Sequence, residues 1–448
     1  MCRGISSKTA ITKIQAIIMI IVIVVAGSIT YYYFTLTQVK PSEKEYITFG
    51  VTLPLTGSMA FEGEHRSRTI DIITQYLNEK GGLFVKEYGR KLNVTYILYD
   101  DTSDPARVRD NIERLVTIDK VDFLFCDQSG NKEAVMMMAQ KYKIPQLSSG
   151  WLPAMLDQKG DVWFFSIIPP YSEYPRSSLE FIKWVIDNPN IPANLKPQRI
   201  AMVYGSGSFG VASHAGALYW AKTYGIDHLI VAQEQYLDGA KDFTPVITKV
   251  MAANPDVFFA NGRSSDTQYL IYQAKEMGLN CKLWVNVLGS DTDEFRNVLG
   301  DKGLGIVGLR SNWPAQPWAG EWCGFKWSSA EIFDRYYKRG INYTSGYDIS
   351  TLGCFQVLTE AIYRAGTLNF TAVRNKILEL GKEGFMIMYI GTWLCNQTTG
   401  ERMGARFAAC QLQMVGGALK PVIVYPEEQF GFKIQEAKPI YPDPTYKP

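Results

Sequence analysis

The glycine spacing at residues 205–210 is the first pattern in the chain that could do chemistry. These residues read GSGSFG, follow a β-branched run that ends at Tyr204 and precede a helical pattern, which is the context of the dinucleotide fingerprint G-x-G-x-x-G. The fingerprint needs an acidic side chain about 20 residues later to hold a ribose hydroxyl, and Glu234 stands near the next strand. An NAD-dependent oxidoreductase is therefore one hypothesis.

Other catalytic chemistry has little support in the residues. The chain has three histidines, His65, His214 and His228, and none belongs to a recognisable acid–base constellation. It contains no Gly-x-Ser-x-Gly, His-Glu-x-x-His or P-loop lysine motif, and no Cys-x-x-Cys pair that would favour zinc. We therefore expect a protein that is not an enzyme and that holds neither a cofactor nor a metal.

The elements that must position any functional residue alternate in type along the first part of the chain. β-branched, apolar runs predict strands, and amphipathic patterns between them predict helices. In chain order, these patterns lie at 47–53, 66–78, 92–99, 107–118, 121–125, 133–143, 146–148 and 162–168. The alternation predicts parallel βαβ units, and the mostly apolar strands suit a sheet that helices cover on both faces.

A second series of the same kind begins after the Pro/Asn-rich stretch 187–197. Its predicted strands lie at 199–204, 257–260 and 283–287, and helices are predicted further on at 329–339 and 351–365. A Trp-rich section at 312–327 separates them, where we expect a surface segment or the rim of a cleft. Two similar series in a chain of 448 residues predict two α/β lobes.

An uncharged segment at 14–36 is long enough to cross a bilayer, because a spanning helix needs about 20 apolar residues. The three basic residues in 1–13 place that end in the cytoplasm by the positive-inside rule. Residues 31–34 read YYYF and resemble an interfacial aromatic belt, not a signal-peptidase site. We expect an N-terminal membrane anchor, a linker at 37–45 and an extracellular domain beyond it.

The overall charge argues against one class of partner. Forty-six basic and 44 acidic residues leave a net charge of +2, and no long run of like charge appears, so nothing indicates binding to nucleic acid. Four Asn-x-Ser/Thr acceptors, compatible with an extracellular domain, begin at Asn93, Asn342, Asn369 and Asn396. Cys395 and Cys410 flank a Gly/Thr-rich turn, where a disulfide and buried reduced thiols are both open alternatives.

An ordered series of short motifs carries more information than any one of them. The motifs are FGVTLPLTG at 49–57, KGG at 80–82, DDTSDP at 100–105, KPQRIA at 196–201 and GAKDF at 239–243. In this order they resemble the branched-chain amino-acid and amide binding proteins of ABC transporters, the Leu/Ile/Val-binding family, from about 46 to 425. The resemblance implies the type I periplasmic binding protein fold, with two doubly wound parallel-sheet lobes joined by three hinge crossings.

The resemblance also implies domain bounds and a ligand site. The first lobe would comprise 46–170 and 310–388, the second 171–309 and 389–430, and 431–448 would be a C-terminal coil. The ligand-binding residues carried over from the family pattern, or placed beside it, are Phe61, Ser129, Ser148, Ser149, Gly150, Trp151, Phe209, Arg263, Ser264 and Asp291. Hydroxyls and backbone amides in such loops suit a desolvated anionic group.

The largest departure from the family pattern concerns the acid that normally pairs with a ligand ammonium. Leu288 stands at that position, and a buried ammonium without a carboxylate is costly. Arg263 could instead anchor a carboxylate, unless Asp291 or Asp266 supplies the missing charge. An amino acid, an amide, a urea-like solute and an organic acid are therefore all open as ligands.

The function that the resemblance implies is solute binding for an ABC importer, with delivery of a small polar solute to a membrane permease. A membrane-tethered sensory ectodomain of the same fold is the alternative, since fold alone does not separate the two. Only 13 residues precede the apolar segment, so we expect no signalling domain there. The importer hypothesis is therefore preferred over the sensor and over the oxidoreductase.

Overall fold

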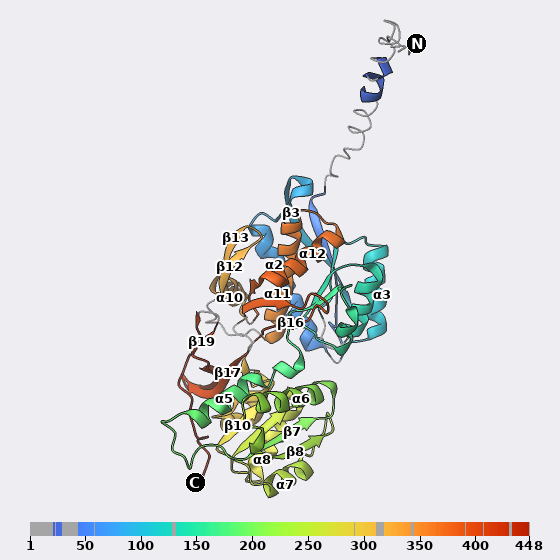
Figure 1. Ribbon diagram of the computed structural model, residues 1–448. Coiled ribbons are helices and arrows are strands. Elements are labelled where there is room, and N and C mark those ends of the chain that lie inside the picture. The colour runs from blue at the N-terminus through green and yellow to red at the C-terminus, as the bar shows by residue number, and fades with distance from the viewer. Residues whose placement is uncertain are drawn as a thin grey trace, which may run out of the picture. The chain divides into compact units, whose positions relative to one another are not determined.

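The computed structural model in Figure 1 describes residues 21–22, 24–28, 44–57, 59–127, 131–290, 292–310, 318–341, 345–389, 391–405, 407–429 and 432–447. The chain divides into two units, Met1–Glu45 and Tyr46–Pro448. In the first unit, residues 21–22 and 24–28 are helical and exposed, and the rest of the predicted apolar segment lies outside the described residues. Among the described helices, none combines the length and the apolar character needed to span a membrane.

The first lobe is built on a sheet with the strand order β2-β3-β1-β4, and β5 and β6 form a separate parallel pair. β1 runs parallel to β3 and β4, and only β2 is antiparallel, which confirms the predicted βαβ series. These strands are β1 (Tyr46–Leu53), β2 (Leu83–Val85), β3 (Arg90–Asp100), β4 (Phe123–Phe125), β5 (Gln146–Ser148) and β6 (Phe164–Ser166).

Five longer helices complete the first lobe, and two of them are far apart in sequence from its strands. They are α2 (Ala60–Glu79), α3 (Pro105–Thr117), α4 (Lys132–Tyr142), α11 (Gly346–Ala365) and α12 (Phe370–Glu383). α3 begins close to its predicted start, because Asp104 accepts a hydrogen bond from the Ala106 amide and Pro105 occupies the first turn. α2 begins earlier than the predicted residue 66, because its first turns bury charged side chains that leave no apolar stripe in the sequence.

The described part of the Trp-rich section is a hairpin followed by a helix. Its tryptophans are buried, but Ala319, Glu321 and Lys326 are exposed, and residues 312–317 lie outside the described residues. The surface segment or cleft rim stays a prediction. Its elements are β12 (Ala319–Trp322), β13 (Phe325–Ser328) and α10 (Ser329–Lys338). Trp322 stacks on Tyr76 of α2 with ring centroids 5.6 Å apart, and its indole N–H donates to the Thr359 hydroxyl of α11 at 2.8 Å. The hairpin therefore covers core helices of the first lobe.

The second lobe contains a seven-stranded sheet in the order β18-β17-β11-β10-β9-β7-β8. The pairs among β7 to β11 are parallel, and β17 and β18 add an antiparallel edge. Its strands are β7 (Ile200–Gly205), β8 (Ile230–Tyr236), β9 (Val257–Asn261), β10 (Leu283–Asn286), β11 (Val307–Arg310), β17 (Ala408–Val415) and β18 (Ala418–Tyr425). Its helices are α5 (Arg176–Asp187), α6 (Ser208–Thr223), α7 (Thr244–Ala252), α8 (Ser264–Glu276) and α9 (Asp293–Leu299).

The chain changes lobes between β6 and α5, between β11 and β12, and between β16 and β17; Figure 1 shows the helices and strands of each lobe gathered separately. The third change comes later than the predicted boundary at 388–389. β14 (Phe385–Ile387), β15 (Gly391–Cys395) and β16 (Arg402–Met403) form one antiparallel sheet against α12, so 391–403 lies with the first lobe.

Buried Arg402 links two of these connecting segments. Its guanidinium donates to the carbonyl oxygens of Ile167 at 2.6 Å, Tyr389 at 3.0 Å and Thr392 at 3.1 Å. The residue as a whole is 2% exposed. Ile167 directly follows β6, where the first connection begins. The guanidinium therefore holds the connection after β6 against the segment that contains Tyr389 and Thr392, which precedes the third change of lobe.

The cysteines and the C-terminal segment complete the description. Cys395 lies in β15 and Cys410 in β17, in different sheets. Both are buried and neither forms a disulfide, so the alternative of a disulfide between them is wrong. After the short hairpin β19 (Glu428–Gln429) and β20 (Phe432–Lys433), the segment predicted as coil follows the second lobe. There, the Gln411 side-chain amide donates to the Ile440 carbonyl, and the Asp443 backbone N–H donates to the Lys282 carbonyl, both at 2.8 Å.

Candidate functional site

A cavity of about 670 Å³ lies between the two lobes. Its walls come from α2, the loop after β5 and α11 on the first lobe, from the loops after β7, β9 and β10 on the second, and from the connecting segments. Loops at the carboxyl ends of parallel strands commonly form ligand crevices in α/β proteins. The volume lies within the range of small-molecule sites, about 300–1,000 Å³.

A buried ion cluster beneath the cavity organises its first-lobe wall. Arg66 is fully buried and pairs with Glu62 at 2.8 Å and with Asp127, while Thr351 of α11 bonds to both Arg66 and Asp127. Burial alone lowers the pKa of Arg66, but the carboxylates of Asp127 and Glu62 outweigh it and raise the pKa above its ordinary value. The cluster joins α2, the β4 loop and α11.

Ser149 owes its position to this cluster. The second oxygen of the Asp127 carboxylate accepts the Ser149 backbone N–H at 2.6 Å, which fixes the loop after β5. Ser149 lines the cavity, and the residue is 7% exposed. Within the described part of the chain, this hydroxyl has no hydrogen-bond partner. A buried hydroxyl without a partner is costly, so Ser149 is a ready contact for a polar ligand group.

The other residues predicted in this loop have structural contacts instead. The Ser148 hydroxyl accepts the Gly150 N–H at 2.9 Å, and the Trp151 indole donates to Glu401 at 2.7 Å. Ser148, Gly150 and Trp151 do not line this cavity, so their role as ligand-binding residues stays a prediction. Ser129 and Asp291 lie outside the described residues. The remaining five, which line the cavity, are Phe61, Ser149, Phe209, Arg263 and Ser264.

A series of aromatic rings forms the cavity wall at the hinge. Phe209, from the start of α6, meets Tyr171 and Tyr174 edge-on, with ring centroids 5.1 and 5.5 Å apart. Tyr174 in turn packs on Phe407 at 4.8 Å. Phe209 therefore lines the cavity and also packs against the connecting segments. Such ring pairs contribute about 0.5–1.5 kcal/mol each beyond the area that they bury.

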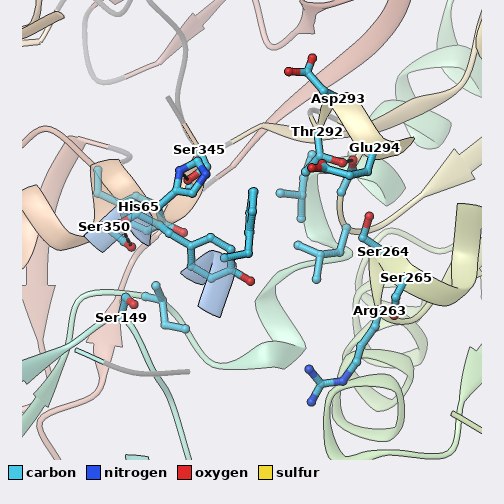
Figure 2. Close-up of a pocket in the computed structure, with 18 of the residues that line it drawn as sticks. His65, Ser149, Arg263, Ser264, Ser265, Thr292, Asp293, Glu294, Ser345 and Ser350 are labelled. Atoms are coloured by element: carbon cyan, nitrogen blue, oxygen red, sulfur yellow. Dashed lines mark hydrogen bonds between the residues drawn. The ribbon is translucent and has the colours of Figure 1, made fainter. Parts of the chain in front are cut away.

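A histidine that sequence analysis left without a role also faces the cavity. The Nδ1 atom of His65 lies 2.8 Å from Asp348 Oδ2, and the Ser345 hydroxyl and Arg68 Nη2 each lie 2.8 Å from the same nitrogen. Burial alone raises the pKa of Asp348, but hydrogen bonds from His65 and Arg68 outweigh it and lower the pKa. Figure 2 shows His65 and Ser345 together on the first-lobe side. The network fixes the orientation of the imidazole.

The second-lobe wall carries Arg263, Ser264 and Leu288. The Arg263 side chain is 63% exposed, and its nearest carboxylate is Asp238, 3.9 Å from Nε. Asp266 accepts the Gly239 N–H at 3.0 Å and does not line the cavity, so it does not replace the missing acid. The apolar side chain of Leu288 does line the cavity, where the family pattern has an acid.

The carboxylate of Asp238 occupies the space beside the glycine-rich loop after β7. Asp238 accepts the Gly207 N–H at 3.0 Å, and a Cβ on Gly205 or Gly207 would lie 2.4 or 2.2 Å from its carboxylate oxygens. A dinucleotide pyrophosphate would therefore meet a carboxylate at these amides, which opposes binding. Glu234, the proposed ribose partner, pairs with Lys249 at 2.8 Å. Both contacts argue against the oxidoreductase hypothesis.

Comparison with known families agrees with this architecture. The family model described as periplasmic binding protein matches residues 46–405. The chain belongs to the periplasmic binding protein family. This assignment confirms the resemblance drawn from the motif series. The periplasmic binding protein fold also explains why the cavity lies between lobes, where hinge closure surrounds a ligand.

Relatives of this periplasmic binding protein are distant in sequence. A Leu/Ile/Val-binding protein homolog from Brucella abortus is 22% identical over 233 residues, which are 52% of this chain and 56% of that relative. The match thus spans little more than half of the relative's length. A solved structure of a putative branched-chain amino acid ABC transporter from Silicibacter pomeroyi has a TM-score of 0.72 at 18% identity, covering 88% of this chain and 99% of its own.

A second solved structure is that of the branched-chain amino acid transporter substrate-binding protein from Streptococcus pneumoniae, in complex with isoleucine. It matches with a TM-score of 0.63 at 16% identity, over 84% of this chain and 99% of its own. At these identities, the likeness concerns the fold of the periplasmic binding protein. The substrate-binding proteins of ABC transporters thus share its fold.

Several cavity residues of the periplasmic binding protein were missed from the sequence. Tyr347 lies in the first turn of α11, which was predicted to begin only at residue 351. Tyr171 follows Pro169-Pro170, a loop signal that gives no direction for the side chain. The capping box at Ser345 and Asp348 could have placed the start of α11 correctly and indicated Tyr347.

Proposed function

We propose that this protein is the extracytoplasmic solute-binding component of an ABC importer, and that it closes its lobes on a small polar solute for delivery to the membrane permease. The observation that carries the proposal is the cavity between the lobes, which is lined by Ser149 with its unpartnered hydroxyl. The names of the relatives support an amino acid as the solute. Amides and organic acids are the alternatives.

The mechanism follows from the connections between the lobes. Rotation about them would bring the Ser149 wall toward the Arg263 wall and remove the solute from water. A ligand that contacts both walls binds the closed state better than the open state, and so shifts the population toward closure. The closed form presents both lobes to the permease in one fixed arrangement, which lets the permease distinguish loaded from empty protein.

A thermal-shift screen of the unit Tyr46–Pro448 tests the proposal. The unit is compact in itself and would be screened against amino acids, amides, urea, carboxylates and NAD. A solute that binds only the folded state raises the free energy of unfolding by about 2.7 kcal/mol at one hundred times its dissociation constant. We expect one class of polar solute to raise the melting temperature. A response to NAD alone, or to nothing, would contradict the proposal.

Replacement of Ser149 by alanine should weaken solute binding by about 1–3 kcal/mol, because a buried ligand group would lose its hydrogen bond. Isothermal titration with the solute found in the screen measures the change. Ser177→Ala is the matched control, since Ser177 is also a buried hydroxyl without a partner but lies in α5 away from the cavity. Equal affinities for Ser149→Ala and the unmodified protein would remove Ser149 from the site.

We further propose that residues 14–36 anchor the protein to the cell membrane. The support is the length of the uncharged segment and the basic residues before it. Membrane fractionation of cells that express the full chain or the chain from Tyr46 tests this. Anchoring predicts the full chain in the membrane fraction and the shorter chain outside it; equal distribution would contradict it.

A further inference from the structure

Most aromatic side chains on the cavity wall belong to the hinge series described above, in which each ring already packs on another. Two others lie on the first lobe, Phe61 in α2 and Tyr347 in α11. Their ring centroids are 6.3 Å apart and their planes meet at 79°, an edge-on arrangement. The first-lobe wall therefore carries an aromatic pair of its own.

Phe61 leaves much of its ring uncovered. The His65 imidazole, one turn further along α2, packs on it with ring centroids 4.3 Å apart. The residue is nevertheless 50% exposed, although it is apolar and lines the cavity. Apolar surface on the wall of a concave site is what a ligand of matching shape buries.

Tyr347 covers the buried ion cluster. The Arg66 guanidinium lies over its ring, 5.2 Å from the centroid, which is a cation–π contact. That contact occupies one face of the ring, and the residue lines the cavity. Burial raises the pKa of Tyr347 to about 12, so the phenol is uncharged near neutral pH and can pack against an apolar group of a solute.

The same cluster places the aromatic pair on the wall that carries Ser149. Arg66, which lies over the Tyr347 ring, pairs with Asp127, and Asp127 accepts the Ser149 N–H at 2.6 Å. Figure 2 shows Ser149 on the first-lobe side together with His65, which packs on Phe61, and Ser350, whose hydroxyl donates to the Tyr347 carbonyl at 3.2 Å. An apolar ring surface and an unpartnered hydroxyl thus share one wall.

We propose that the solute carries a planar aromatic ring, which packs against Phe61 and Tyr347 while a polar group of the solute bonds to Ser149. The inference rests on the proposed solute-binding function and narrows the solute by its ring, whichever polar group it bears. Aromatic rings attract one another edge-to-face or offset, because the positive edge of one meets the negative face of the other. A saturated ring gains the burial without this attraction.

Calorimetric titration of the unit Tyr46–Pro448 with ring-matched solutes tests the inference. The pairs are benzoate and cyclohexanecarboxylate, benzamide and cyclohexanecarboxamide, and phenylalanine and cyclohexylalanine. The members of a pair share their polar group, and the saturated ring is at least as apolar, so burial alone does not favour the aromatic member. In every pair that binds, we expect the aromatic member to bind about three- to tenfold more tightly.

Variants of the two rings show where the preference arises. Phe61→Leu and Tyr347→Leu should each reduce the preference for the aromatic member about threefold, whereas Tyr347→Phe keeps the ring and should retain the preference. Phe84→Leu is the matched control, because Phe84 is 39% exposed on β2 and does not line the cavity. It should leave both affinities of a pair unchanged.

Three results would overturn the inference and leave the proposed function standing. They are equal or tighter binding of the saturated members, a preference that survives both leucine variants, and a wider screen in which only aliphatic solutes bind. If no solute of the wider screen binds, the inference and the proposed function are both overturned.

Discussion

Substitution of Arg66 by alanine should lower the free energy of unfolding by about 3–5 kcal/mol, because it leaves buried carboxylates without their cation. Arg66 is fully buried between Glu62 and Asp127, and Thr351 bonds to it at 3.0 Å. Removing one member of such a cluster costs more than the cluster contributes as a whole, since the remaining charges are not rehydrated. Guanidinium denaturation followed by circular dichroism measures the loss.

The surface pair between Lys141 and Glu113 provides the contrast. Their side chains are 52% and 53% exposed and their charged atoms are 3.3 Å apart, so Lys141→Ala should cost less than about 1 kcal/mol. A loss below that value for Arg66→Ala would contradict the buried cluster. Because Asp127 also holds the Ser149 amide, the Arg66 variant should bind the solute more weakly than its loss of stability alone explains.

Substitution of Arg402 by alanine should have an effect of similar size, about 3–5 kcal/mol, for a different reason. The guanidinium satisfies the carbonyl oxygens of Ile167, Tyr389 and Thr392 in the interior. Its loss leaves these acceptors without donors and creates a cavity, two of the mechanisms that produce large destabilisation. Denaturant unfolding measures the free energy, and the midpoint of thermal unfolding should fall with it.

Arg199 offers a matched control for Arg402. It also donates to backbone carbonyls, those of Ala253 and Asn254, but at an exposed position. Water can replace those hydrogen bonds, so Arg199→Ala should cost about 1 kcal/mol or less. Equal losses for the two variants would show that the interior position of Arg402 has no special importance for stability.

The secondary structure could be predicted largely from sequence because local patterns determine it. Strand β5 was predicted with its observed bounds, Gln146–Ser148, and α3 was placed within two residues of Pro105. The start of α2 was missed because its first turns bury the charged residues Glu62 and Arg66, and Arg66 has a partner distant in sequence. Arg66 pairs with Asp127, 61 positions away, and a local sequence pattern cannot predict such a pairing.

The sequence predicted which loops form the site, but not which side chains of those loops line the cavity. Ser148 and Ser149 are neighbours of the same type, yet only Ser149 lines the cavity. Their directions depend on the Asp127 carboxylate, which holds the Ser149 amide, and on the Gly150 N–H, which occupies the Ser148 hydroxyl.

The aromatic series at the hinge bears on the heat of ligand binding. Tyr171, Phe209, Tyr174 and Phe407 meet edge-to-face or at a tilt, so a rotation of the lobes can move one ring across the next while all remain covered. Apolar burial on binding is what gives a negative heat-capacity change. If the hinge exposes little apolar surface in either state, the heat-capacity change of binding measures the apolar surface that the cavity walls and the solute bury. Calorimetry over a series of solutes would then measure how much of each one the closed protein covers.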